Sequence, residues 1–142
     1  MNFFSIFTYT GRTGLYLSCI KRKKMVKLAN YKLKKRGIFI SNPNNIGENF
    51  VIGHPVSIVI GDKVIIGDNV KIYQCVMIGQ KNNKYPRIGN NVVIYPNSVI
   101  VGDITIGDNC IIGAGSVVIS SIPNNCVAAG LLPTPLSSVM KT

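Results

Sequence analysis

A six-residue period governs the sequence from Ile46 onward and limits the folds that the chain can adopt. Isoleucine or valine recurs there mostly at intervals of six, and glycine follows eight of the twelve positions: 46, 52, 60, 66, 72, 78, 88, 94, 100, 106, 112 and 118. This period does not match an α-helix, whose faces recur every 3.6 residues, and β-branched residues favour short strands. We therefore predict an all-β fold, a parallel β-helix with three flat sides and about four coils.

A second inward position is expected four residues after each periodic aliphatic residue, where the side chain is mostly smaller. This set includes Val56 and Cys110, and we expect both to fill the interior. The glycines are predicted to supply corner conformations that other residues resist, and the Asp-Asn and Asn-Asn pairs to form turns. The four cysteines form no Cys-x-x-Cys pair, so we expect free thiols in a reducing cytoplasm.

Positive charge is concentrated at the N-terminus. Residues 1–36 hold ten basic residues and no acid, whereas residues 37–142 hold six basic residues and five acids. We therefore divide the chain into a basic, partly helical arm (1–37), a β-helix domain (38–130) and a C-terminal tail (131–142). The arm suits peripheral contact with an anionic membrane surface, or packing as a helix on a neighbouring subunit. It lacks interleaved aromatic residues for stacking bases, so no nucleic-acid partner is expected.

The six-residue rhythm breaks twice, and both breaks carry polar residues. One interval lengthens to eight at His54, the only histidine of the chain, and another lengthens to ten between Ile78 and Ile88. The second interruption, GQKNNKYPR, must bulge from a corner as a basic loop. Irregularities in a solenoid map to loops, which often carry function. A single histidine excludes the three-histidine zinc site of β-helical carbonic anhydrases, so no metal is expected.

Four stretches together resemble the hexapeptide-repeat acyltransferases, and most closely their serine O-acetyltransferase branch: HPVSIVIGD (54–62), QCVMIG (74–79), IGDNCIIGAGSVV (106–118) and AAG (128–130). The resemblance implies a left-handed β-helix, assembled as a homotrimer, with acetyl-CoA as the acyl donor in grooves between subunits. It also implies that His54 is the catalytic base, because imidazole changes charge near neutral pH and can take the proton of an attacking hydroxyl.

The same resemblance assigns residues to the two substrates. The residues expected to bind acetyl-CoA are Gly79, Lys81, Arg87, Pro96 and Ala114. The two cations of this set suit the phosphates of the donor. Lys84 and Tyr85 of the loop are expected to contact the acceptor. For each of Lys81, Lys84 and Arg87 taken singly, the alternative explanation is a side chain of a solvated basic loop with no role in binding.

Two departures from the serine O-acetyltransferase pattern bear on the acceptor. Gly53 and Phe39 stand where that branch has aspartates, just before the histidine and fifteen residues before it. A serine ammonium then lacks an acid to pair with, and His54 needs another orienting group, such as Ser41, Asn42 or a backbone carbonyl. We therefore expect a cytoplasmic enzyme that uses acetyl-CoA to acetylate a sugar hydroxyl in surface polysaccharide biosynthesis. The acceptor is expected to be a small-molecule sugar or a lipid-linked sugar, the latter at the inner membrane face. Serine O-acetylation and a non-catalytic scaffold are the alternatives.

Overall fold

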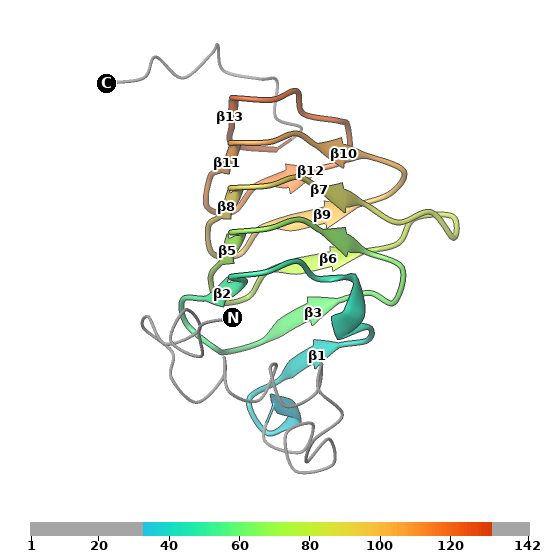
Figure 1. Ribbon diagram of the computed structural model, residues 1–142, viewed down its shortest axis with the longest axis vertical. Coiled ribbons are helices and arrows are strands. Elements are labelled where there is room, and N and C mark those ends of the chain that lie inside the picture. The colour runs from blue at the N-terminus through green and yellow to red at the C-terminus, as the bar shows by residue number, and fades with distance from the viewer. Residues whose placement is uncertain (1–32, 132–142) are drawn as a thin grey trace.

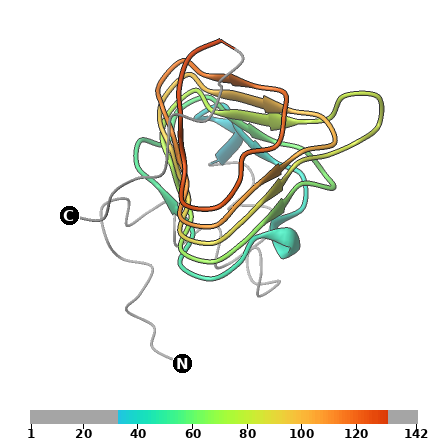
Figure 2. The same cartoon turned by 90° about the horizontal axis from the view of Figure 1, so that it is seen from above.

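The computed structural model describes residues 33–131, so the predicted helical arm and the tail lie almost entirely outside the described part of the chain. Within this part, thirteen short strands and one 3-10 helix, η1 (Pro43–Asn45), wind into a stack of coils (Figure 1). Seen along the stack, the backbone traces a three-sided prism with one loop projecting from a corner (Figure 2). The predicted all-β parallel β-helix is confirmed.

Each side of the prism is a parallel sheet. Sheet A contains β1 (Ile38–Ile40), β3 (Ile58–Ile60), β6 (Met77–Gly79), β9 (Val99–Val101) and β12 (Val117–Val118). Sheet B contains β4 (Ile65–Ile66), β7 (Arg87–Ile88) and β10 (Thr105–Ile106), extended by single bridges at Ile46 and Ile122. Sheet C contains β2 (Val51–Ile52), β5 (Lys71–Ile72), β8 (Val93–Ile94), β11 (Ile111–Ile112) and β13 (Val127–Ala128). The two five-stranded sheets give five coils, one more than predicted, because β1 and β13 lie outside the periodic segment.

The periodic aliphatic residues stack inside the prism as predicted. In sheet C, the side chains of Ile52, Ile72, Ile94 and Ile112 lie in register in successive coils, and each is at most 2% exposed. Burying one such side chain contributes about 1.5–3 kcal/mol to folding. The strand register is fixed as well, because a shift by one residue would turn the whole set outward.

The smaller inward positions follow the prediction with one exception. Cys110 is fully buried, and this burial raises the pKa of its thiol. Val56 is 55% exposed, and Ile58 fills the interior position in its place. The two extra residues at His54 come before this position, so they move the inward side chain from residue 56 to residue 58. The prediction for Val56 is wrong for this reason.

The corner between sheets B and C, here called the asparagine corner, is a column of five residues with φ between 54° and 58°: Asn49, Asn69, Asn91, Asn109 and Asn125. Their side-chain amides are joined by hydrogen bonds of 2.9–3.1 Å. The glycines that follow the periodic aliphatic residues do not have positive φ. They are required because a Cβ on Gly67 or Gly89 would meet the backbone of the next coil. Asparagine therefore supplies the corner conformation, as predicted, and glycine supplies space, which was not predicted.

Candidate functional site

The longer interval at His54 forms the first of two irregular corners. Residues 53–57 join β2 to β3, between sheets C and A. We call the column of residues 53–57, 73–75, 95–97 and 113–115 the His54 corner. The His54 carbonyl oxygen accepts a hydrogen bond from the Val56 N–H at 2.9 Å, and Ser57 has a φ of 53°. The insertion therefore closes as a γ-turn centred on Pro55, which leaves the imidazole of His54 exposed.

The imidazole of His54 has an aromatic neighbour, and no hydrogen bond or ion pair joins it to any residue between 33 and 131. The ring of Tyr73 lies 6.0 Å away between centroids, and the two planes are tilted by 44°. Ser41 and Asn42, which were expected to orient the histidine, do not contact it. They follow β1 at the other end of the strands of sheet A, where the Asn42 side chain accepts a hydrogen bond from the Asn44 N–H.

A stacked pair of tyrosines continues the His54 corner. The rings of Tyr73 and Tyr95 lie 5.2 Å apart between centroids and within 4° of parallel. The Lys71 Nζ lies 5.0 Å from the centroid of the Tyr73 ring. On the other side of this ring lies Gly53, where a Cβ would come within 2.8 Å of two ring carbons. Sequence analysis missed both tyrosines, although a signal was present. Each follows a periodic isoleucine, a position at which glycine otherwise predominates.

Two of the residues predicted to bind acetyl-CoA, Pro96 and Ala114, lie in later coils of the same corner. The Pro96 carbonyl oxygen accepts a hydrogen bond from the Gly115 N–H at 2.8 Å, which ties these coils together. Gln74 follows Tyr73 in the corner, and its buried Oε1 has no hydrogen-bond partner among the described residues. An unsatisfied buried acceptor costs about 1–3 kcal/mol, so this oxygen is a candidate partner for a ligand donor.

The second irregular corner, here called the loop corner, joins sheet A to sheet B and includes residues 80–86 between β6 and β7 (Figures 1 and 2). Lys81 and Lys84 exchange two backbone hydrogen bonds of 3.0 Å. Between them, Asn82 and Asn83 have φ of 52° and 60°. This arrangement is a two-residue hairpin with a type I′ turn. The predicted basic loop at a corner is confirmed.

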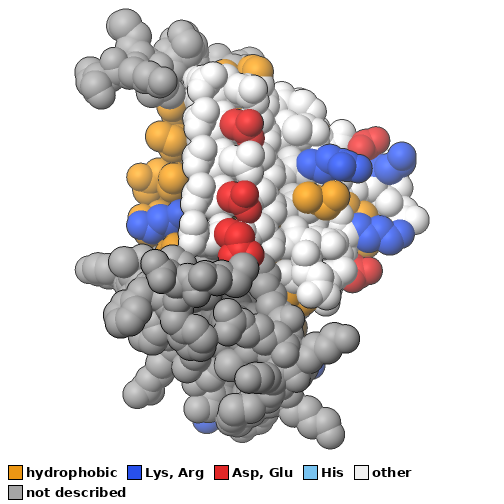
Figure 3. Space-filling model, viewed as in Figure 1, with side chains coloured by type: hydrophobic (Ala, Val, Ile, Leu, Met, Phe, Trp, Pro, Cys, Tyr) orange, Lys and Arg blue, Asp and Glu red, His pale blue; other side chains and the backbone are white. Residues whose placement is uncertain are grey.

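The side chains of the loop corner are mostly exposed and basic. The Lys84 Nζ lies 3.7 Å from the Asp103 Oδ2 at the surface, where such pairs are worth little. Tyr85 packs against the core, and the Lys63 Nζ lies 6.0 Å from the centroid of its ring. Arg87 begins β7 and is exposed. Figure 3 shows basic side chains gathered on this side of the molecule, with acidic ones beside them.

The predicted site residues therefore fall into two groups. His54, Pro96 and Ala114 share the His54 corner. The loop corner holds Gly79, Lys81, Lys84, Tyr85 and Arg87. These corners lie at opposite ends of the strands of sheet A, so one copy of the chain does not bring the two groups together.

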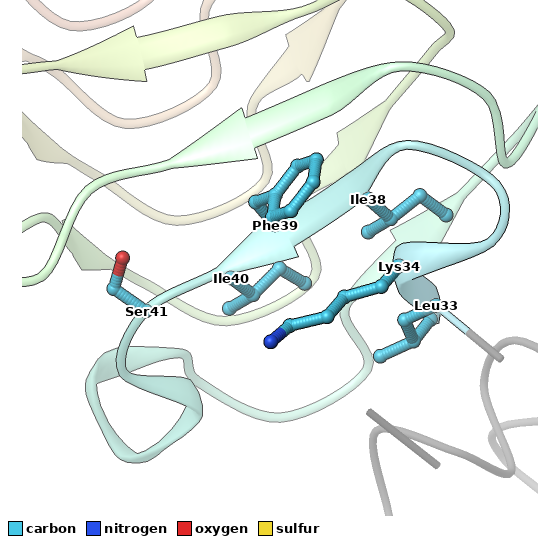
Figure 4. A pocket seen from close by; sticks show the side chains of 6 residues that line it. All are labelled: Leu33, Lys34, Ile38, Phe39, Ile40 and Ser41. Carbon is cyan, nitrogen blue, oxygen red and sulfur yellow. The ribbon is translucent and has the colours of Figure 1, made fainter. Parts of the chain in front are cut away.

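A small pocket lies at the N-terminal end of the β-helix, away from the predicted site residues. It is lined by Leu33, Lys34, Ile38, Phe39, Ile40 and Ser41 (Figure 4) and has a volume of about 180 Å³. Its walls are apolar apart from Lys34 and Ser41. None of the residues predicted to bind a substrate contributes to it.

Between residues 33 and 131, no three His, Cys, Asp or Glu side chains are grouped so that they could hold a metal ion. In the same part of the chain, no helix is long and apolar enough to cross a membrane.

Comparison with known proteins identifies relatives of the β-helix. A family model described as bacterial transferase hexapeptide (six repeats) matches residues 85–120. Over 99 residues, or 67% of the chain, the sequence is 42% identical to a serine acetyltransferase from Staphylococcus epidermidis, of which it covers 46%. The structure of serine acetyltransferase in complex with coenzyme A from Brucella abortus strain S19 matches with a TM-score of 0.73 at 25% identity, over 99% of this chain and 59% of that one.

A maltose O-acetyltransferase from Clostridium difficile 630 matches with a TM-score of 0.65 at 28% identity, over 92% of this chain and 83% of that one. The repeat, the coiled architecture and these matches together place the chain in the hexapeptide-repeat transferase family. The chain spans less than half the length of the curated serine acetyltransferase that it matches, at 46%.

Proposed function

We propose that the chain transfers an acetyl group from acetyl-CoA to a hydroxyl oxygen, with His54 as the general base. One observation carries this proposal: the only histidine stands exposed on an insertion in an otherwise regular column, beside the ring of Tyr73. Similarity to serine acetyltransferases and to a maltose O-acetyltransferase supports the class of reaction. The relative solved in complex with coenzyme A supports the donor.

The chemistry follows from the poor nucleophilicity of a hydroxyl group that keeps its proton. The neutral imidazole of His54 accepts this proton while the oxygen attacks the thioester carbonyl. Backbone N–H groups at the edge of a coil stabilise the tetrahedral oxyanion. The carbon–sulfur bond then breaks, and the imidazolium returns the proton to the departing thiolate, which gives free CoA and an acetyl ester. A positioned general base of this kind accelerates a reaction by about 10²–10⁴-fold.

The separation of the two residue groups is explained if the active site lies between copies of the chain in a homotrimer. The loop corner of one copy then faces the His54 corner of the next. An apolar stripe on the outer face of sheet A supports such an assembly, because exposed apolar patches favour contact with a partner. Phe39, Val59 and Met77 follow one another along this face and are 48%, 41% and 42% exposed.

Within this assembly, acetyl-CoA runs along Pro96 and Ala114 of one copy and past Gly79 of the neighbouring copy. The hairpin of that neighbour supplies Lys81 and Arg87, whose cations suit the phosphates of the donor. In this arrangement, Lys84 and Tyr85 of the neighbouring copy lie near the acceptor. The proposed membrane contact concerns the basic arm, which lies almost entirely outside residues 33–131. The cytoplasmic location remains a prediction.

The acceptor has two candidates. The comparisons support serine better than the sugar expected from the sequence, because the curated relatives are serine acetyltransferases. A sugar hydroxyl is kept as the second candidate on a specific observation: the His54 corner contains no carboxylate that could pair with the ammonium group of serine.

A thiol-release assay with acetyl-CoA tests the proposal. The full chain, His54→Ala and a control, Thr105→Ala, would be compared with serine and with methyl glycosides as acceptors. Thr105 is exposed on sheet B and belongs to neither irregular corner. We expect acceptor-dependent CoA release that falls at least about 10²-fold in His54→Ala and is unchanged in Thr105→Ala. Equal release by wild type and His54→Ala would overturn the role of the histidine. The absence of release and of CoA binding would favour the scaffold alternative.

A further inference from the structure

We propose that Tyr73 determines acceptor specificity at the His54 corner, by excluding hydroxyl compounds that carry an ammonium group. The ring of Tyr73 takes the space beside His54 in which an acidic side chain would be needed to bind such a group. The acceptor is accordingly a neutral or anionic hydroxyl compound, such as a sugar or a sugar acid. This inference rests on the proposed acetyl transfer and decides between its two acceptors.

The first argument is steric. Gly53 directly precedes His54, and a Cβ at this position would come within 2.8 Å of the Cδ1 and Cε1 atoms of Tyr73. Real Cβ atoms do not approach ring carbons so closely, so a side chain at position 53 would require the Tyr73 ring to shift. The ring is held in place by Tyr95, which stacks on it at 5.2 Å and within 4° of parallel.

The second argument is electrostatic. All five acids of the chain lie on the other two corners: Glu48, Asp68 and Asp108 on the asparagine corner, and Asp62 and Asp103 on the loop corner. Of the latter pair, Asp103 is already paired with a lysine. Beside the stacked pair of tyrosines lies a cation, Lys71, whose Nζ is 5.0 Å from the centroid of the Tyr73 ring. An acceptor ammonium placed beside His54 would therefore meet a cation and no carboxylate on this corner, and its counter-ion could come only from Asp62 or Asp103 on the loop corner of the neighbouring copy.

The third argument concerns hydrogen bonding. The buried Oε1 of Gln74, the residue after Tyr73, has no donor among the described residues. A second hydroxyl of the acceptor can supply this donor once the Gln74 side chain turns its buried oxygen towards the surface, and a neutral group of this kind needs no opposite charge. A compound with several hydroxyl groups therefore fits the corner better than one with a single hydroxyl and an ammonium.

Two matched pairs of acceptors test the inference, since each pair differs by the presence of an ammonium group. The pairs are serine with N-acetylserine, and glucosamine with N-acetylglucosamine. The values of kcat/KM would be measured for wild type and for Tyr73→Phe, Tyr73→Ala, Gly53→Asp and the double variant Gly53→Asp/Tyr73→Ala. Tyr73→Phe is the matched control, because it keeps the ring and removes only the hydroxyl.

We expect wild type and Tyr73→Phe to favour the ammonium-free member of the productive pair by at least about tenfold. In Gly53→Asp/Tyr73→Ala, which makes room for a carboxylate and introduces it, we expect this ratio to shift by at least about tenfold towards the ammonium-bearing member. Urea unfolding of each variant gives a second readout. Gly53→Asp should lower the free energy of unfolding when Tyr73 is present. It should lower it much less in Tyr73→Ala, because the clash between the introduced side chain and the tyrosine ring is then removed.

The outcomes separate the inference from the proposed function. If wild type acetylates serine as well as N-acetylserine, and glucosamine as well as N-acetylglucosamine, the specificity inference is overturned while acetyl transfer stands. The steric argument would also be overturned if the double variant lost as much free energy of unfolding as Gly53→Asp and Tyr73→Ala lose together. If wild type transfers acetyl to none of the four compounds and matches His54→Ala, the proposed function fails and the inference fails with it.

Discussion

Substituting alanine for Gly67 tests why glycine recurs in this sequence. A Cβ at this position would lie 2.8 Å from the carbonyl carbon and oxygen of Gly89 in the next coil. The coils can separate only by lengthening the hydrogen bond from the Gly67 N–H to the Ile88 carbonyl, now 2.9 Å. The adjacent bond from the Asp68 N–H to the Asn90 Oδ1, now 2.8 Å, would lengthen with it.

The expected loss follows from these contacts. Two weakened hydrogen bonds cost about 0.5–1.5 kcal/mol each, and overpacking strain adds about 1–3 kcal/mol. Gly67→Ala should therefore lower the free energy of unfolding by about 2–6 kcal/mol. Gly79→Ala is the matched control, because a Cβ there meets no atom within 4 Å and the residue does not have positive φ. Its unfolding free energy should stay the same or rise by up to about 1 kcal/mol.

Urea unfolding followed by far-UV circular dichroism measures both variants, and this probe is chosen because the chain has no tryptophan. All proteins should be compared at one concentration, since an assembly would make stability depend on it. The reasoning is refuted if the two alanine variants unfold at the same urea concentration, or if Gly67→Ala is as stable as wild type.

Three further predictions address the core and the corners. Ile58→Ala should lower the free energy of unfolding by about 2–5 kcal/mol, because this side chain is buried. Val56→Ala should change it by less than about 0.5 kcal/mol, because this side chain is exposed. Equal effects of the two variants in urea unfolding would contradict the assignment of Ile58, and not Val56, to the interior. Asn91→Ala should lower the free energy of unfolding by about 1–3 kcal/mol in the same assay. The substitution removes two hydrogen bonds of 3.0 and 3.1 Å and leaves alanine in the left-handed region, at φ 55°. Asn91→Gly should recover part of the loss, and no difference between the two would rule out a backbone contribution. Burial raises the pKa of the Cys110 thiol, so its contribution to stability is present below the pKa of the unfolded thiol and is lost as pH rises above it. Unfolding measured from pH 7 to about 10 should therefore show an alkaline loss of stability that is smaller in Cys110→Ala, and an identical loss in both proteins would contradict this sign.

The repeat made most of the fold predictable, because its period determines which side chains face inward in every coil. Ile72 and its neighbours in sheet C could be assigned to the core from spacing alone. The position of Ile58 could not, since the sequence does not show on which side of an inward residue two inserted residues lie. The role of glycine was also hidden, because it depends on the distance between coils and not on the conformation of one residue.

The candidate site was predictable only in part. His54 and the basic loop were found because they interrupt the pattern. Tyr73 and Tyr95 keep the six-residue spacing, and their only signal in the sequence is that each replaces a glycine; that the two rings stack on each other is known only from the structure. The Gln74 oxygen, which has no hydrogen-bond donor among residues 33–131, is likewise a property of the packed corner, and no sequence motif predicts it.

The central claim is direct transfer of acetyl from the thioester to an acceptor hydroxyl, with His54 taking the proton. Rapid-quench single-turnover experiments with radiolabelled acetyl-CoA test it most directly, with the full chain and with His54→Ala. The account predicts that label moves from CoA to the acceptor oxygen without passing through the protein, and that the rate falls at least about 10²-fold in the variant. A label that accumulates on the protein before it reaches the acceptor, or an equal rate in the two proteins, would contradict the account.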